Sequence, residues 1–190
     1  MIYFTGDQHF GHERIIEYCG RPFQSVDEMD TAIVQRFCSV VTSEDAVFDI
    51  GDFCFPGRGG KAKAIAKTNS YLTQMPCNKR FLILGNHDDD NACRGSEWNG
   101  VYSEWFRMTI DGIRVQLQHR PVHWPDRFAL SDKVDVVLRG HTHQKPPLVK
   151  RLTSTLIEIN VGVDQWNFAP VAWETIRDIC EKMLPLKRRI

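Results

Sequence analysis

The sequence predicts an α/β fold in a single domain that spans residues 1–190. Several short apolar runs, such as residues 81–84, are too short for a helix and stop at a glycine or a polar side chain, which is typical of buried strands. Between these runs lie stretches such as residues 25–41, whose apolar side chains recur at helical spacing. With 42% hydrophobic residues in 190, the chain is long enough to bury one substantial core.

The first part of the chain predicts a strand at residues 1–5 and then a helix that continues to about residue 18. Ser25 and Glu28 have the spacing of a capping box, which marks the start of a second helix. Behind this cap the apolar stripe of the second helix is predicted to face the core. It consists of Met29, Ile33, Val34, Phe37, Val40 and Val41.

The middle of the chain predicts strands at residues 46–50 and 81–84, with a helix at about residues 61–75 between them. The buried face of that helix is predicted to consist of Ala62, Ile65, Ala66, Leu72 and Met75. Residues 91–106 lack clear periodicity, so they predict either a substrate-facing insertion or a surface loop with buried aromatic side chains.

The last part of the chain predicts four further strands and a final helix. Residues 113–118 alternate between apolar and polar side chains, which indicates a strand with one buried face. The other strands are predicted at residues 134–138, 156–161 and 170–173, and the helix at residues 174–184.

The composition of the chain disfavours two classes of partner, long duplex nucleic acid and membranes. Lys plus Arg equals Asp plus Glu, 24 each, so no overall positive field attracts long duplex nucleic acid. No apolar run approaches the ~20 residues of a membrane span, so no membrane contact is expected. The amino terminus enters a strand directly, and the six cysteines are scattered without a C-x-x-C pair, which predicts a cytoplasmic protein with reduced thiols.

Polar side chains follow the predicted strands where these end, at the edge where open α/β sheets usually place ligands. Asp7 and His9 are two residues apart, so they would point the same way if strand geometry persisted, and His141 and His143 repeat the spacing. One such histidine alone indicates a capped or solvated polar residue, but the repetition indicates a site. The set comprises Asp7, His9, Asp52, Asn86, His87, His119, His141 and His143. Imidazole, carboxylate and amide donors without cysteine suit Mn, Fe, Zn or Ni.

These residues stand in ordered blocks: Asp7-x-His9, Gly51-Asp52, Gly85-Asn86-His87-Asp88, His119 and Gly140-His141-x-His143. The series resembles the calcineurin-like metallophosphoesterase superfamily, and residues 5–12 and 160–164 resemble its small bacterial and phage branch. The resemblance implies a sandwich of two mixed β-sheets flanked by helices, with the metal site at the strand ends.

The resemblance also implies roles for individual residues. It implies two divalent transition-metal ions, with Mn favoured, and a water that the metals activate for attack on phosphorus. One metal would be held by Asp7, His9, Asp52 and His143, and the other by Asp52, Asn86, His119 and His141. His87 would act as the general acid. Asn86, His12 and Arg120 are the candidates for contact with the substrate.

The sequence departs from the superfamily's protein phosphatases after Gly51-Asp52, where those enzymes continue with an Asp-Arg pair that binds a phosphate monoester. Neither residue stands in the expected place here, although Arg58, Arg94 or Arg120 could supply the cation. We therefore expect a small phosphodiester substrate, of the cyclic-nucleotide or nucleic-acid type. A phosphomonoesterase, a nucleotide pyrophosphatase and a non-catalytic binding scaffold on the same fold are the alternatives. The retained His87 and ligand set disfavour the scaffold.

Overall fold

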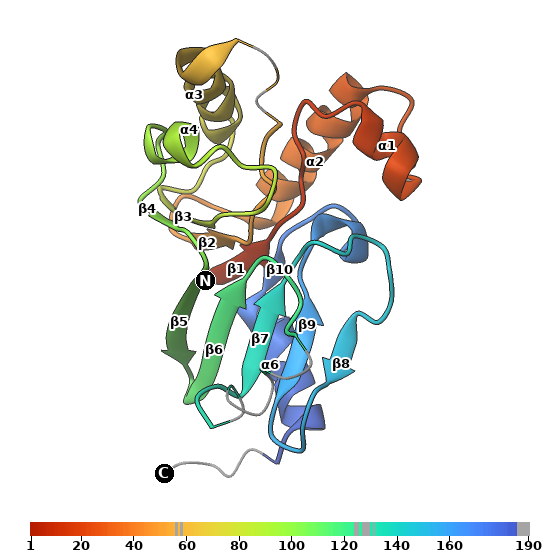
Figure 1. Cartoon of the computed structure of the whole chain (residues 1–190), viewed down its shortest axis with the longest axis vertical. Helices are drawn as coiled ribbons and strands as arrows, with labels where there is room; N and C mark the ends of the chain where they lie inside the picture. The colour runs from red at the N-terminus through yellow and green to blue at the C-terminus, as the bar shows by residue number, and fades with distance from the viewer. Residues whose placement is uncertain (56, 58, 124–125, 127–129, 131, 186–190) are drawn as a thin grey trace.

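The computed structural model describes residues 1–55, 57, 59–123, 126, 130 and 132–185. Within these residues, two five-stranded mixed sheets form the centre of the molecule (Figure 1). In the first sheet, β1 to β4 run parallel and β10 pairs antiparallel with β1. Its strands, in spatial order, are β10 (Val171–Ala172), β1 (Ile2–Thr5), β2 (Ala46–Asp49), β3 (Lys79–Ile83) and β4 (Gly100–Tyr102).

The second sheet has a parallel centre and antiparallel edges. Strands β6, β7 and β9 run parallel, while β5 and β8 pair antiparallel with their neighbours. Its strands, in spatial order, are β5 (Trp105–Ile110), β6 (Ile113–Gln118), β7 (Val136–Arg139), β9 (Ile157–Asn160) and β8 (Val149–Arg151). The predicted sandwich of two mixed sheets is therefore confirmed.

Helices flank the sheets, as predicted. They are α1 (Arg14–Cys19), α2 (Val26–Val40), α3 (Gly60–Leu72), α4 (Asp90–Arg94) and α6 (Trp173–Met183), with a short 3₁₀ turn η1 (Val163–Gln165). The predicted cap is present at α2, because the Ser25 hydroxyl accepts a hydrogen bond from the Glu28 backbone N–H. The helices α1 to α4 gather at the first sheet (Figure 1), whereas α6 contacts β10 and β1 and contributes side chains to the core between the sheets.

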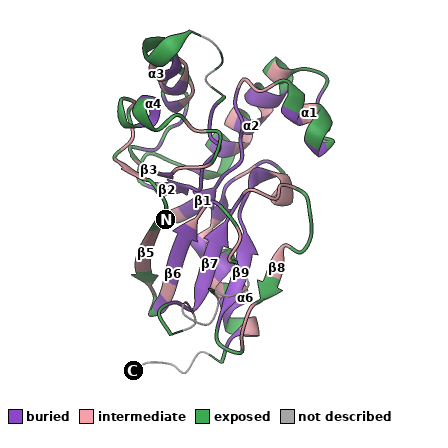
Figure 2. Ribbon diagram, viewed as in Figure 1, coloured by how far each residue is buried: buried purple, intermediate pink, exposed green. Residues whose placement is uncertain are grey.

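Alternation along the strands of the first sheet separates two apolar cores. Tyr3 of β1 faces the core beneath α2 and α3, whereas its neighbour Phe4 faces the core between the sheets. Val47 and Phe48 of β2 divide in the same way. The second sheet is mostly buried (Figure 2), because its strands contribute fully buried aliphatic side chains such as Leu117 to the core between the sheets.

Three local predictions were wrong, in whole or in part. In α2, Met29, Ile33 and Phe37 are buried as predicted, but Val40 is exposed at the end of the helix. Residues 91–106 are not an insertion or a long loop: they contain most of α4, all of β4 and the start of β5, and so carry the chain from one sheet to the other. Their lack of periodicity reflects three short elements in succession.

The face of α3 was predicted wrongly in part: Ala62 and Ala66 are exposed, and Ala64 and Thr68 are buried instead. The predicted burial of Leu72 and Met75 is confirmed.

Two further findings bear on the environment of the protein. Within the part of the chain that the structure describes, no helix is both long enough and apolar enough to cross a membrane. All six cysteines are free. Burial raises the pKa of the Cys54 thiol to about 12, so this group stays protonated at neutral pH.

Candidate metal centre

The ends of five strands supply every sequence-predicted ligand. Since β1, β2 and β3 run parallel, as do β6 and β7, their carboxyl ends meet at one edge of the sandwich. The chain after β1 supplies Asp7 and His9, after β2 Asp52, after β3 Asn86 and His87, after β6 His119, and after β7 His141 and His143.

The structure brings six of these side chains into two clusters, in each of which one ligand atom per residue lies within 4.8 Å of the others. The first cluster consists of Asp7, His9 and His143, and the second of Asp52, His119 and His141. Each is an imidazole–carboxylate set of the kind that binds divalent transition metals. That these clusters bind metal stays a prediction.

Asp52 lies between the clusters. Its Oδ2 is 3.3 Å from His119 Nε2 and 3.5 Å from His9 Nε2, so one carboxylate oxygen faces a ring from each cluster. The Asn86 Oδ1 is 3.2 Å from the same His119 nitrogen, which places Asn86 beside the second cluster. The arrangement allows one carboxylate to serve two ions.

Most of the predicted ligands adopt a left-handed backbone, which costs a residue with a side chain of order 1–3 kcal/mol and concentrates at functional sites. They are Asp7 (φ 59°), His9 (φ 55°), Asp52 (φ 56°), His141 (φ 71°) and His143 (φ 49°). The expectation that strand geometry aligns Asp7 with His9 was therefore wrong, because β1 ends at Thr5. Sharp turns bring the two side chains together.

The close packing of the turns depends on glycine. Gly51 has a φ of 87°, and a Cβ at this position would lie 2.4 Å from the backbone nitrogen of Gly85. Both glycines precede ligand-bearing residues, so their small size lets the turns after β2 and β3 approach each other closely.

A buried imidazole nitrogen tests whether these residues fit a metal. His9 Nε2 is buried and has no hydrogen-bond partner, although an unsatisfied buried polar atom costs about 1–3 kcal/mol. This atom faces the Asp52 carboxylate, which offers a second ligand atom for a metal. A cation between them would satisfy both, so the residues fit a metal ion.

Electrostatics keep the cluster residues in different protonation states. Burial lowers the pKa of His9 to about 2 and that of His141 to about 4, so both rings are neutral. Burial also acts on His119, but its bond to Asp52 outweighs that effect and raises the His119 pKa to about 9. Burial opposes ionisation of Asp52 as well, yet His119 and His9 hold its pKa well below the usual range.

Sequence reasoning missed the residues that support His143. Its Nδ1 lies 2.9 Å from Asp164 Oδ2; this bond outweighs the effect of burial and raises the His143 pKa to about 10. Arg21 in turn donates two hydrogen bonds to the Asp164 carboxylate. The same guanidinium donates to the backbone carbonyls of Asp7 and Gln8. One buried cation therefore fixes the turn after β1 directly and His143 through Asp164.

The signal for this support was weak in the sequence. Asp164 ends the block 160–164 that carries part of the family resemblance, but nothing in that block indicates a partner. Asn160 of the same block donates a hydrogen bond to the backbone carbonyl of His143. Arginine side chains are mostly exposed in proteins, and only the fold shows that Arg21 is buried.

Asp88 organises the backbone of the turns. Its carboxylate accepts hydrogen bonds from the backbone N–H groups of Asp52, Phe53 and Gly85, at 2.8 to 3.0 Å. Burial nevertheless raises the Asp88 pKa to about 6. Backbone groups occupy both carboxylate oxygens, so Asp88 does not orient the His87 ring.

His87 lies beside the first cluster with its side chain exposed. Its backbone N–H donates to Asp52 Oδ1, and its ring centroid lies 5.3 Å from that of His9 and 6.1 Å from that of His12. No carboxylate or carbonyl among the described residues bonds to the His87 ring. His12 also stacks on Phe55, at 4.5 Å between ring centroids, so an aromatic surface borders the general-acid candidate.

The three candidate cations differ in position. Arg58 lies outside the described residues. Arg94 pairs with Asp90 within α4 and donates to the Val101 carbonyl, so its guanidinium is engaged there. Arg120 is exposed and follows His119 directly, and its charge contributes to the low pKa of His141. Of these three arginines, Arg120 is therefore the one that lies near the clusters.

Comparison with known proteins finds relatives over nearly the whole chain, but no family model matches. An uncharacterized protein of Methanocaldococcus jannaschii is 28% identical over 186 residues, which cover 95% of this chain and 92% of that protein. The gene 66 protein of Mycobacterium phage L5 is 29% identical over 187 residues, 86% of each chain.

Among solved structures, a protein of unknown function from Aquifex aeolicus superposes with a TM-score of 0.72 at 22% identity, over 94% of this chain and 98% of that chain. This chain shares its fold. An archaeal phosphodiesterase superposes more loosely, with a TM-score of 0.49 at 17% identity over 85% of this chain and 82% of its own. That superposition is too loose to bear on function.

Proposed function

We propose that this protein is a dinuclear-metal phosphoesterase of the calcineurin-like type that hydrolyses a phosphodiester, with His87 as the general acid. The observation that carries the proposal is the pair of clusters at one edge of the sandwich, joined through Asp52. Two adjacent cation sites with a shared carboxylate are the arrangement that two-metal phosphoryl-transfer chemistry requires. The order of the sequence blocks supports the same assignment.

The described residues would divide between two divalent ions, for which we favour Mn over Fe, Ni or Zn. The first ion would be held by Asp7, His9, Asp52 and His143, and the second by Asp52, Asn86, His119 and His141. When bound, the metals would acidify a water and offset the negative charge of the reacting phosphate. Arg21 and Asp164 would keep the His143 ring turned toward the first ion, since Asp164 occupies its Nδ1.

His87 is proposed to deliver a proton to the leaving oxygen. It is exposed at the rim of the first cluster, so a bound ester can reach its ring. Its backbone is fixed by the bond to Asp52, which holds the residue at the site while the side chain keeps its freedom. General acid catalysis of this kind contributes typically ~10²–10⁴-fold when the leaving group is a poor one.

Charge favours a diester over a monoester. A monoester dianion gains more from a dedicated arginine clamp. Arg120 is the exposed candidate arginine near the clusters, whereas the buried Arg21 is already engaged by Asp164. A diester carries one negative charge and depends less on such a clamp. We therefore propose a small nucleotide-type ester as the substrate, because the balanced net charge of the chain disfavours long nucleic acid.

The test is a hydrolysis assay with metal-reconstituted protein. We expect activity that a chelator abolishes and Mn restores, with a higher kcat/KM for bis-p-nitrophenyl phosphate than for p-nitrophenyl phosphate. The reverse ranking at the same metal and pH would favour the monoesterase. Stoichiometric metal binding without hydrolysis of either ester, of cyclic nucleotides or of oligonucleotides would favour the binding scaffold.

A further inference from the structure

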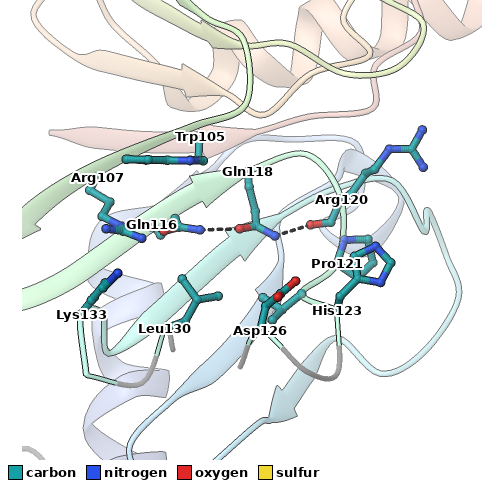
Figure 3. A pocket seen from close by; sticks show the side chains of 11 residues that line it. Trp105, Arg107, Gln116, Gln118, Arg120, Pro121, His123, Asp126, Leu130 and Lys133 are labelled. Atoms are coloured by element: carbon teal, nitrogen blue, oxygen red, sulfur yellow. Dashed lines mark hydrogen bonds between the residues drawn. The ribbon is translucent and has the colours of Figure 1, made fainter. Parts of the chain in front are cut away.

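A pocket lies on the outer side of β5 and β6, separate from the two clusters (Figure 3). It encloses about 320 Å³. Its floor is formed by the outward side chains of the two strands, and its lower rim by Leu130 and Lys133. The β5–β6 register pairs Trp105 with Gln118, the last residue of β6, so the pocket begins next to the strand end that carries His119.

Arg107 is held in this pocket without a charged partner. Its Nε donates a 2.6 Å hydrogen bond to Gln116 Oε1, and its guanidinium lies 4.5 Å from the centroid of the Trp105 ring. No described residue forms an ion pair with it. The terminal nitrogens of an arginine fixed in this way keep a planar fork that suits a phosphate.

Lys133 approaches the same space. Its side chain and that of Arg107 point toward each other in Figure 3, and neither has an acidic partner among the described residues. Two cations that converge repel each other unless an anion lies between them. The carboxylate that lines the pocket, Asp126, lies at its other end beyond Leu130 (Figure 3).

A hydrogen-bonded chain connects the pocket with the candidate metal centre. Beyond Arg107, Gln116 Nε2 donates to Gln118 Oε1, and Gln118 Nε2 donates to the Arg120 carbonyl. The Arg120 side chain itself points away from the pocket (Figure 3), and its charge acts on His141 of the second cluster. Arg120 therefore lies between the two sites: its backbone carbonyl is at the pocket, and its guanidinium is near the second cluster.

We propose that this pocket binds the continuation of a short single-stranded nucleic acid beyond the scissile linkage, with a phosphate between Arg107 and Lys133. Trp105, which is 49% exposed, offers its indole to a base. Cations beside an exposed aromatic ring are the usual means of binding single strands without sequence preference. The inference rests on the proposed function, because it narrows the substrate from any phosphodiester to an oligonucleotide.

The experiment measures binding to the metal-loaded protein by fluorescence anisotropy. The probe is a fluorescein-labelled tetrathymidylate with phosphorothioate linkages, which resist hydrolysis. Arg107→Gln and Lys133→Gln should each raise Kd about tenfold, as expected for one lost charge-assisted contact. Each should also reduce the slope of log Kd against log salt by about 0.7. Trp105→Leu should weaken binding roughly tenfold or more, with little change in the salt slope.

Lys150→Gln is the matched control, because it removes the same charge from exposed β8, away from the pocket residues. Its Kd should equal that of the wild type. Lys133→Gln also guards against misfolding, because no described side chain depends on the Lys133 ammonium. Equal Kd values for Lys133→Gln, Lys150→Gln and wild type would overturn the inference, as would tighter binding of poly-glutamate than of the thymidylate.

The two proposals fail separately. If the protein hydrolyses bis-p-nitrophenyl phosphate but does not bind the tetrathymidylate, the pocket assignment is wrong and the phosphoesterase proposal stands. If the thymidylate binds and responds to the pocket variants while no ester is hydrolysed, the pocket stands as a nucleic-acid site and the phosphoesterase proposal fails.

Discussion

Replacement of Arg21 by methionine tests how the fold supports the first cluster. The Arg21 side chain is buried, with 5% of the residue exposed. It donates two hydrogen bonds of 2.9 Å to Asp164, one of 2.6 Å to the Asp7 carbonyl and one of 2.8 Å to the Gln8 carbonyl. Methionine fills much of the same volume but donates none of these bonds. Asp164 would then keep a buried negative charge with His143 as its remaining partner.

The magnitude follows from those contacts. Removal of one partner from a buried ion pair costs about 3–5 kcal/mol. Each carbonyl left without a donor adds about 1–3 kcal/mol, although such losses do not add fully within one network. We expect Arg21→Met to lower the free energy of unfolding by about 4 kcal/mol or more, a large part of the ~5–15 kcal/mol of a typical domain. Arg21→Lys should recover little, because an ammonium lacks the planar fork.

The assay is urea unfolding in the presence of a chelator, so that metal affinity does not contribute. Asp164→Asn and the double variant complete a cycle with Arg21→Met. The double variant should be more stable than the sum of the single losses predicts, by about 2 kcal/mol, because no unpaired charge remains. Arg177→Met, which breaks only surface ion pairs, should change stability by less than about 1 kcal/mol. A loss below 1 kcal/mol for Arg21→Met, or additive losses in the cycle, would refute this account.

Three further predictions concern the metal centre. Asp52→Asn should lower the content of both ions together, as measured by elemental analysis; full loading with unchanged turnover would remove its shared role. His87→Ala should keep both metals, lose most activity on a diester with an alkoxide leaving group and lose much less on a nitrophenyl ester; loss of metal would instead make His87 a ligand. Metal binding at pH 7 should release about two protons, one each from His119 and His143. Their pKa values of about 9 and about 10 keep these rings protonated without metal, so affinity should rise as pH rises toward those values. Calorimetry in buffers of different ionisation enthalpy counts these protons, and a count near zero would contradict the raised pKa values.

The elements of the fold were largely predictable because they follow from local patterns. The alternation of residues 113–118 predicted β6 with the bounds that the structure has, and the capping box predicted the start of α2. Residues 91–106 were not predictable in this way, because α4, β4 and β5 are too short, or too exposed, to leave a periodic signal.

The candidate site was likewise predictable only in part. The sequence by itself identified the residues at the strand ends, since a polar side chain after a glycine and an apolar run is a local signal. It did not predict how they meet: the strand ends at Thr5, and left-handed turns at Asp7 and His9 carry the chain into the site. Those strained conformations persist because contacts with neighbouring turns hold them. The neighbouring turns are distant in the sequence, so a local sequence pattern cannot predict these contacts.

The residues that support the site were decided by tertiary structure alone. Arg21 and Asp164 lie 143 positions apart in the sequence, and their ion pair exists only because the packed sheets bring α1 and η1 together. The pocket with Arg107 and Lys133 likewise depends on the strand register and on the approach of Leu130 and Lys133 to β5 and β6. A sequence shows which groups can carry chemistry, because side-chain chemistry is local. Which of them are buried, paired or left facing an empty pocket depends on contacts between distant segments, and those form only when the chain folds.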